Sequence, residues 1–334
     1  MKLLDLIPST PTWTVTDSSK LSTYMACPRK YFYQYILGWR SNRPNNHLVF
    51  GSAWHLALEH LMLTDYSTQS VLDAYAKMVS YYREVFPPET DELFTPKDMA
   101  TALLALSAYA FHHRHDLDTH NVLHTEIAGT VMLSRDHTMT FRMDAILEEK
   151  STGTIIALDH KTSGYYSPDW GDHWALSTQM LTYLHSLYCL YPNNDKYIKV
   201  RTSFFFDQSG KTKTGRNRDP KPFVFEEHKV EKSYDMMEAW LHRTLHWLKA
   251  LDTDKWKLFH VLTTDDITLD AFAQNDNACF NYGRRCAYFD LCNAWANPIR
   301  HCEHSPIGMQ VEYWDPLSEP IIKEIVHLAP PEEQ

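Results

Sequence analysis

The sequence predicts an α+β fold, in which a mixed β-sheet is flanked by helices. Helical patterns dominate the first 120 residues, where apolar side chains recur at every third or fourth position. Three strand-like stretches then follow one another, and a helix and further strands come after them. Strands arranged in this way, with helices before and between them, are typical of an α+β core. The chain of 334 residues is long enough to bury such a core.

The N-terminal region is expected to consist of successive helices. An aromatic helix is predicted over residues 23–37, and Gly38 is placed to end it. Further helices are predicted over residues 50–63, 70–85 and 97–114.

The sheet is expected to begin after this region. A β-hairpin is predicted from residues 138–147 and 154–160, because Ser151, Thr152 and Gly153 form a turn signal between two apolar stretches. The remaining elements are a strand over 122–134, a helix over 174–190, a strand over 196–207 with a hairpin partner over 223–229, and a long amphipathic helix over 232–251. The tail from Phe272 onward is aromatic and cysteine-rich, and it is expected to be irregular.

Composition and charge restrict the class of protein. Hydrophobic content of 44% and charged content of 22% are ordinary for a soluble globular protein. Asp5 and Pro8 interrupt the only apolar run near the N-terminus, so no signal peptide is expected. The longest uncharged apolar run, residues 99–111, is too short to span a bilayer. We therefore expect a cytoplasmic protein with no membrane partner.

The predicted hairpin brings three chemically important side chains together. Side chains alternate between the two faces of a strand, so Asp159 and Lys161 point the same way and His160 points the opposite way. Asp144 lies near the end of the partner strand. Two carboxylates suit a hard divalent cation such as Mg²⁺, and a lysine beside them can orient a water or stabilise a phosphoryl transition state. Charged residues at strand ends are common, so this pattern needs support from elsewhere in the chain.

Two helices supply that support. His55 lies on the predicted helix 50–63, four residues after Gly51. Gln179 and Tyr183 are four residues apart on the helix that follows the predicted hairpin, so they share a face. A lone histidine is more often a half-buried helix residue than a ligand, and a glutamine–tyrosine pair at this spacing occurs by chance on many helices. His55, Gln179 and Tyr183 therefore support a metal site only through their order in the chain relative to Asp144 and Lys161.

In this order the motifs resemble the PD-(D/E)XK nuclease superfamily, and within it the RecB-like exonucleases. The resemblance implies a restriction-endonuclease-like core whose active site holds Mg²⁺ or Mn²⁺. It also implies roles for the matching residues: Asp144, Asp159 and Lys161 would form the catalytic set, His55, Asp144, Asp159 and the backbone carbonyl of His160 would hold the metal, and Gln179 and Tyr183 would help to place the DNA and the lysine.

The cysteines indicate a second site. Cys279, Cys286 and Cys292 cluster in the tail. Disulfides are disfavoured in a cytosolic protein. The spacing of these cysteines is too irregular for a common zinc finger. Three thiolates need a fourth ligand. Similarity to the AddB-type subset of RecB-like nucleases implies that this ligand is Cys27 and that the four cysteines bind a [4Fe–4S] cluster. Two alternatives stay open: Cys302, with His301 and His304 nearby, as the fourth ligand, and a structural Zn²⁺ in place of the cluster.

Nucleic-acid binding requires local basic surface, because the net charge of the chain is −10. Tyr165 and Tyr166, just after Lys161, are candidates for stacking on exposed bases. No P-loop motif is present, so DNA unwinding would need a helicase or recombination partner protein. One cluster of candidate phosphate contacts contains Lys211, Lys213, Arg216 and Arg218. Arg284 and Arg285, in the cysteine segment, are further candidates.

The expected function is metal-dependent DNA exonuclease activity, acting on single-stranded DNA or DNA ends in phage or bacterial recombination, repair or processing. The alternative is a catalytically silent DNA-binding or assembly module, which the complete catalytic set disfavours. We expect one integrated domain in three parts: a helical region (1–120) with Cys27 and His55, the nuclease core (121–252), and an iron–sulfur segment with a tail (253–334).

Overall fold

The computed structural model describes residues 1–206, 223–281, 284–318 and 321–330. The predicted basic cluster of Lys211, Lys213, Arg216 and Arg218 lies outside these residues. Within the described part of the chain, no helix combines the length and the apolar character needed to cross a membrane.

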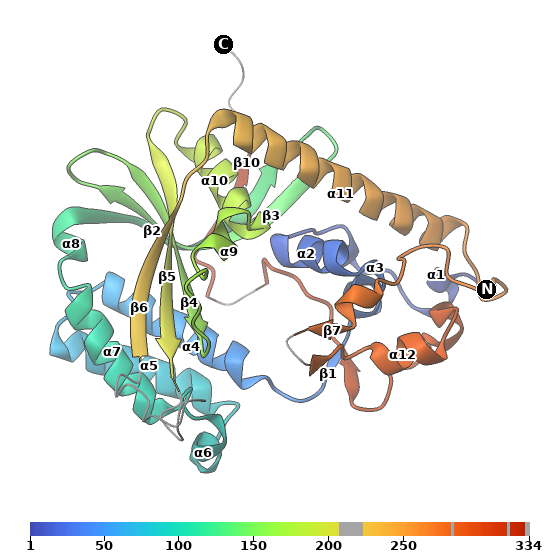
Figure 1. The fold of residues 1–334 in the computed structure, drawn as a ribbon, viewed down its shortest axis with the longest axis horizontal. Helices are drawn as coiled ribbons and strands as arrows, with labels where there is room; N and C mark the ends of the chain where they lie inside the picture. The colour runs from blue at the N-terminus through green and yellow to red at the C-terminus, as the bar shows by residue number, and fades with distance from the viewer. Residues whose placement is uncertain (207–222, 282–283, 319–320, 331–334) are drawn as a thin grey trace.

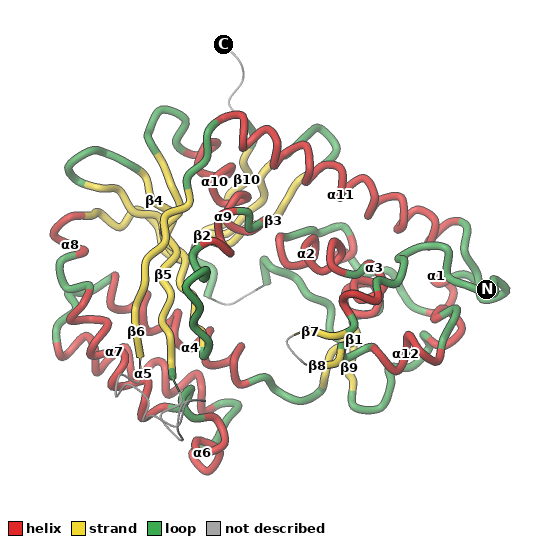
Figure 2. The backbone as a smooth tube through the Cα atoms, in the orientation of Figure 1, coloured by secondary structure: helices red, strands yellow, loops and turns green. Residues whose placement is uncertain are grey.

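A six-stranded mixed sheet forms the centre of the fold (Figures 1 and 2). The sequence predicted a mixed sheet and five of these strands. The strand order of the sheet is β10-β2-β3-β4-β5-β6. The pairs β10–β2 and β4–β5 are parallel, and the other neighbours are antiparallel. The strands of this sheet are β2 (His120–Met132), β3 (Thr138–Glu149), β4 (Ile155–Ser163), β5 (Lys196–Phe205), β6 (Phe223–Val230) and β10 (Glu324–Leu328).

Helices cover both faces of the sheet. One face packs against α4, α5 and α7, through core residues such as Leu147, Ile156 and Leu158. The other face packs against α2, α10 and α11, through residues such as Ile146 and Ala157. Neighbouring residues of a strand thus contribute to opposite faces of the sheet, as the two-residue repeat of a strand requires. The bounds of these helices are Ser18–Ala26 (α2), Asn46–Met62 (α4), Thr68–Arg83 (α5), Met99–His112 (α7), Thr178–Leu190 (α10) and Tyr234–His260 (α11).

The antiparallel hairpin of β3 and β4 opens into a fork. Its backbone pairing runs only from Glu148↔Ile155 to Ala145↔Leu158. Beyond this last pair, β3 remains paired with β2, and β4 remains paired with β5. The next position on each strand is an aspartate, Asp144 on β3 and Asp159 on β4. The separation of the strands therefore leaves room for both carboxylates at one place in the sheet.

A third core joins the two ends of the chain. It contains aromatic residues of the N-terminal segment, such as Tyr31 and Trp39, and residues of the C-terminal segment, such as Phe272 and Tyr288. Tyr31 and Phe272 stack with ring centroids 5.9 Å apart. The 27-residue helix α11 runs from the sheet to this core (Figure 1). The smaller elements are α1 (Leu3–Leu6), α3 (Pro28–Tyr31), α6 (Asp91–Phe94), α8 (Asp116–Thr119), α9 (Asp172–Ala175), α12 (Phe289–Ala294), β1 (Trp39–Ser41), β7 (Phe280–Asn281), β8 (Arg284–Arg285) and β9 (Met309–Val311).

The prediction of one helix over residues 23–37 was wrong. The helix α2 ends at Ala26, Cys27 has extended backbone angles, and α3 begins at Pro28. Proline disfavours the helical conformation in the residue before it, so Pro28 imposes a break at Cys27. The break is followed by a short π-helical turn over Phe32–Ile36, and Gly38, with a φ of 68°, ends the segment as expected.

The C-terminal tail is more regular than predicted. The strand β9 pairs with β1, and β10 extends the central sheet by pairing with β2. This close approach requires a glycine at position 129, because a Cβ there would lie only 1.9 Å from the carbonyl oxygen of Val326. The predicted helix over 174–190 is likewise divided, into α9 and α10.

Candidate active site

A histidine and an aspartate meet where β3 and β4 separate. The Oδ1 atom of Asp144 lies 3.3 Å from Nδ1 of His55, which α4 presents to the sheet. The Oδ2 atom of Asp144 accepts a hydrogen bond of 2.6 Å from the backbone N–H of His160. Burial alone would raise the pKa of Asp144, but His55 and His160 together hold it well below its usual range. Asp144 is therefore ionised and available as a ligand.

Glu126 of β2 joins this pair, and the sequence analysis did not predict it. Ligand atoms of His55, Glu126 and Asp144 all lie within 4.8 Å of one another. Glu126 is 1% exposed, and its Oε2 atom has no hydrogen-bond partner among the described residues. Burial and the Asp144 carboxylate raise the pKa of Glu126 to about 8. Two buried carboxylates at this distance repel each other, so the group fits a divalent cation that binds oxygen and imidazole.

The isosteric substitution Glu126→Gln is expected to weaken Mn²⁺ binding by about 10- to 100-fold, because it removes one anionic oxygen from the metal group. The measurement is isothermal titration calorimetry of the wild-type protein and the variant with Mn²⁺. Thermal melts check that the two proteins are equally stable. Glu59→Gln is the matched control, because Glu59 is also buried near His55 but forms an ion pair with Lys323. Unchanged Mn²⁺ affinity in Glu126→Gln would place this carboxylate outside the metal coordination.

Asp159 and Lys161 form the second half of the site. The Nζ atom of Lys161 lies 2.8 Å from Oδ2 and 3.1 Å from Oδ1 of Asp159. The two side chains therefore lie on the same side of β4, as their spacing predicted. Burial raises the pKa of Asp159 to about 6, and the neighbouring Lys161 ammonium opposes that rise. The ammonium also faces the Trp174 ring at 5.7 Å.

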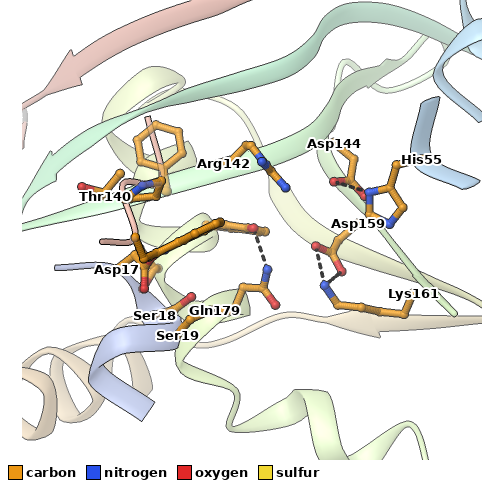
Figure 3. Close-up of a pocket in the computed structure, with 15 residues that line it drawn as sticks. Asp17, Ser18, Ser19, His55, Thr140, Arg142, Asp144, Asp159, Lys161 and Gln179 are labelled. Atoms are coloured by element: carbon orange, nitrogen blue, oxygen red, sulfur yellow. Dashed lines mark hydrogen bonds and ion pairs between the residues drawn. The ribbon is translucent and has the colours of Figure 1, made fainter. Parts of the chain in front are cut away.

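The pocket is completed by side chains that reach it from other elements (Figure 3). Gln179 and Tyr183 lie one turn apart on α10, and the Gln179 amide donates a hydrogen bond of 2.8 Å to the Tyr183 hydroxyl. Arg142 lies on β3 two residues before Asp144 and also lines the pocket. Among the described residues, no hydrogen-bond acceptor or carboxylate pairs with its guanidinium. The pocket thus combines carboxylates for a cation with an unpaired cation suited to a phosphate.

The side chain of His160 does not line this pocket, but its Nδ1 atom lies 3.5 Å from Oδ2 of Asp144. Its Nε2 atom lies 3.0 Å from the Tyr109 hydroxyl of α7. Burial lowers the pKa of His160 to about 4, so the imidazole is neutral. Because Nδ1 faces Asp144 and Nε2 faces Tyr109, only the backbone carbonyl of His160 stays a predicted metal ligand.

The cysteines gather in a separate pocket. Cys27 lies at the break between α2 and α3, and the structure brings it beside Cys279, Cys286 and Cys292. The pKa of Cys279 is raised by burial and by the nearby Cys27 and Cys286 thiols. Thiols that oppose one another's ionisation in this way need a positive group before they become ligands.

Cys302, the alternative fourth ligand, does not line the cysteine pocket. It is buried in the third core, and its thiol donates a hydrogen bond of 3.1 Å to the carbonyl oxygen of Ile299. Its neighbour His301 stacks on Trp295 with ring centroids 4.6 Å apart. The geometry therefore favours Cys27 over Cys302.

Tyr165 and Tyr166 lie in the loop after β4, where their side chains are 68% and 44% exposed. Neither lines the pocket of Asp144 and Lys161. Tyr166 packs edge-on against Phe204, with ring centroids 5.2 Å apart. Base stacking by these two rings stays a prediction.

Two pocket residues come from the C-terminal tail, and no sequence signal identified them. Trp314 and Pro316 line the same pocket as Asp159 and Lys161 of β4. The Trp314 indole donates a hydrogen bond of 2.7 Å to Asp17, which caps the N-terminus of α2. For Glu126 a sequence signal did exist, because a carboxylate within an apolar strand is unusual. Its φ of 48°, which is rare for a residue with a Cβ, is seen only in the structure.

Comparisons with known proteins give one family match. The family model of the PD-(D/E)XK nuclease superfamily matches residues 18–293, which include the fork, the α10 pair and the four clustered cysteines. No curated protein matches the chain. A solved structure described as "Crystal structure of SSO0001" is similar to it at 14% identity, with 58% of this chain and 82% of that chain covered and a TM-score of 0.23.

Proposed function

This chain belongs to the PD-(D/E)XK nuclease superfamily, and from that premise we propose that it is a Mg²⁺- or Mn²⁺-dependent deoxyribonuclease that acts as an exonuclease. The observation that carries the proposal is the fork of β3 and β4. There, buried carboxylates, an imidazole and a lysine lie in one pocket, and the donor set fits a hard divalent cation.

The pocket residues have distinct roles in phosphodiester hydrolysis. His55, Glu126, Asp144 and Asp159 would hold the metal, which would supply Lewis-acid stabilisation of charge on the phosphate. Lys161, held by Asp159, orients the attacking water and stabilises the developing negative charge. Arg142 binds a phosphate oxygen, because its guanidinium is otherwise unpaired.

The α10 pair supports the substrate from another side of the pocket. The hydroxyl of Tyr183 is fixed by Gln179. Burial raises the pKa of Tyr183 well above its usual range, so the phenol stays protonated and can donate to a phosphate oxygen. An exonuclease is preferred because exonuclease action is the commonest activity of the RecB-like nucleases, which the motifs of this chain resemble.

The four clustered cysteines are proposed to hold a [4Fe–4S] cluster rather than Zn²⁺. The four cysteines line one pocket. Four thiolates are the usual ligands of a [4Fe–4S] cluster. The AddB-type nucleases, which this chain resembles, also place one cysteine before the nuclease core and three after it. The role of the cluster is structural, since it joins segments from the two ends of the chain.

The direct test is degradation of end-labelled single- and double-stranded DNA by the purified holoprotein with Mg²⁺ or Mn²⁺, beside an EDTA control. Metal-dependent cleavage with release of mononucleotides or short products from one end is the expected result. Internal cuts in circular DNA would establish an endonuclease instead. DNA binding without cleavage under any of these conditions would support the silent binding module.

A further inference from the structure

A wide groove adjoins the cysteine pocket, and its charge is opposite to that of the chain. Five basic residues line it, and Glu312 is the single acidic residue among its lining residues. The chain as a whole has a net charge of −10. A basic surface on an acidic protein marks a place for a polyanion. The five basic residues are Lys30, Arg40, Arg43, Arg284 and Arg285.

Three of these cations have no protein counter-charge among the described residues. Arg40 lies 3.9 Å from Glu312, and Arg285 lies 3.0 Å from Asp290. No described carboxylate lies within ion-pair distance of Lys30, Arg43 or Arg284. Arg43 and Arg284 are exposed and come from opposite ends of the chain, so folding alone brings them to one groove.

The groove continues toward the catalytic strand. A second hollow shares Ser41, Arg43, Pro44 and Asn45 with the groove and extends to Lys97 and Gly164. Gly164 follows β4 and lies three residues after Lys161. At about 3.3 Å per residue, the hollow comes within about 10 Å of Lys161 along the strand. The second hollow therefore extends from the groove to the end of β4, the strand that carries Lys161.

We propose that this groove binds single-stranded DNA and guides the strand toward Lys161, so that the cysteine segment is part of the substrate-binding surface. The proposal rests on the proposed nuclease function and identifies where its substrate lies. Arg43 and Arg284 contact phosphates. Phe280, which also lines the groove and is 62% exposed, offers a ring for an unpaired base. Stacking of this kind requires unpaired bases, which favours a single strand over a duplex.

The test is fluorescence anisotropy of a labelled single-stranded oligonucleotide, with the holoprotein and no added divalent cation. The double variant Arg43→Gln/Arg284→Gln is expected to bind at least tenfold more weakly. The slope of log K against log salt is expected to fall by about 1.4, which is about 0.7 for each lost phosphate contact. The matched control is Lys77→Gln/Lys249→Gln, which removes two exposed cations from α5 and α11 that line neither hollow. Equal affinity of the two double variants would overturn the proposal.

Phe280→Ala provides an independent measurement. It is expected to weaken single-strand binding by about tenfold without changing the salt slope, because it removes stacking and no charge. Phe111→Ala, on α7, is its control, since Phe111 is 70% exposed and lies outside the groove. Equal losses for single-stranded and duplex DNA would reject the single-strand assignment. Visible absorbance and iron content of each variant show that the cysteine site is intact.

This result is separable from the test of the nuclease. If the wild-type protein cleaves DNA and the groove variants bind and cleave normally, the groove does not bind the substrate, but the nuclease proposal stands. If the groove variants lose binding but the wild-type protein never cleaves, the nuclease proposal fails and the groove remains a single-strand binding surface.

Discussion

Replacing Lys161 with alanine is expected to lower the rate of DNA cleavage by about 10²–10⁴-fold, the range for removal of a positioned proton donor or a charge-stabilising group. Lys161 is half-buried, and Asp159 holds its ammonium at 2.8 Å within the pocket. No other described lysine lines this pocket, so another lysine side chain cannot replace it. The measurement is the single-turnover rate on end-labelled DNA with saturating Mg²⁺.

The matched control for Lys161 is Lys199→Ala. Lys199 lies on the neighbouring strand β5, is half-buried, and forms an ion pair of 3.7 Å with Glu227, but it does not line the pocket. Both variants lose one ion pair on the sheet, so only a catalytic role separates their rates. Thermal melts show that each protein is folded. A Lys161→Ala protein that cleaves as fast as Lys199→Ala would exclude the amine from the chemistry.

Replacing Cys286 with alanine is expected to remove the bound cluster and to destabilise the protein strongly. Cys27 and Cys279 are roughly 250 residues apart, and a cross-link that closes a loop of this size contributes up to about 5 kcal/mol through the unfolded chain. The measurements are visible absorbance and iron and sulfide content after anaerobic purification, followed by calorimetric melting. The variant is expected to be colourless, with a lower melting temperature.

Two other cysteines serve as controls for this experiment. Cys189 lies on α10 and Cys302 in the third core, and neither lines the cysteine pocket. Cys189→Ala and Cys302→Ala are both expected to retain full colour. Cys302→Ala is expected to lose about 1 kcal/mol of stability, because it leaves a small cavity. A colourless wild-type protein with stoichiometric zinc would contradict the iron–sulfur proposal.

Other contacts still join the two ends of the chain when the cluster is absent. The Arg29 side chain donates a hydrogen bond of 3.0 Å to the carbonyl oxygen of Phe272, and Asn275 donates one of 2.8 Å to that of Ala26. The aromatic stacking of the third core adds to them. We therefore expect the Cys286 variant to lose its terminal segments first and to keep the sheet folded to a higher temperature.

The parts of the fold that depend on local sequence were predictable. The hairpin of β3 and β4 follows from two apolar stretches around a glycine turn, and the spacing of Asp159 and Lys161 fixes their common face. The strand β10 was not predictable, because its five residues show no buried alternation and its partner, β2, lies about 200 residues earlier. Pairing over that separation leaves no local signal.

The same distinction applies to the candidate site. Asp144, Asp159, Lys161 and the α10 pair belong to continuous elements, so the sequence places them together once the hairpin is recognised. Glu126 depends on a backbone conformation with positive φ inside a strand, which no propensity indicates. Trp314 depends on how the tail returns to α2, a tertiary contact rather than a pattern.

The return of the tail to the pocket also sets the order in which a newly made chain acquires its active site. Asp144 and Trp314 are about 170 residues apart. Ribosomes add about 5–20 residues per second, so Asp144 is synthesised roughly 10–30 s before Trp314. Lys323 comes later still, and it connects β2 with α4 by a hydrogen bond to the carbonyl oxygen of Glu126 and an ion pair with Glu59. During its own synthesis the polypeptide thus carries an unfinished pocket, and DNA meets a complete one only after translation has passed these residues.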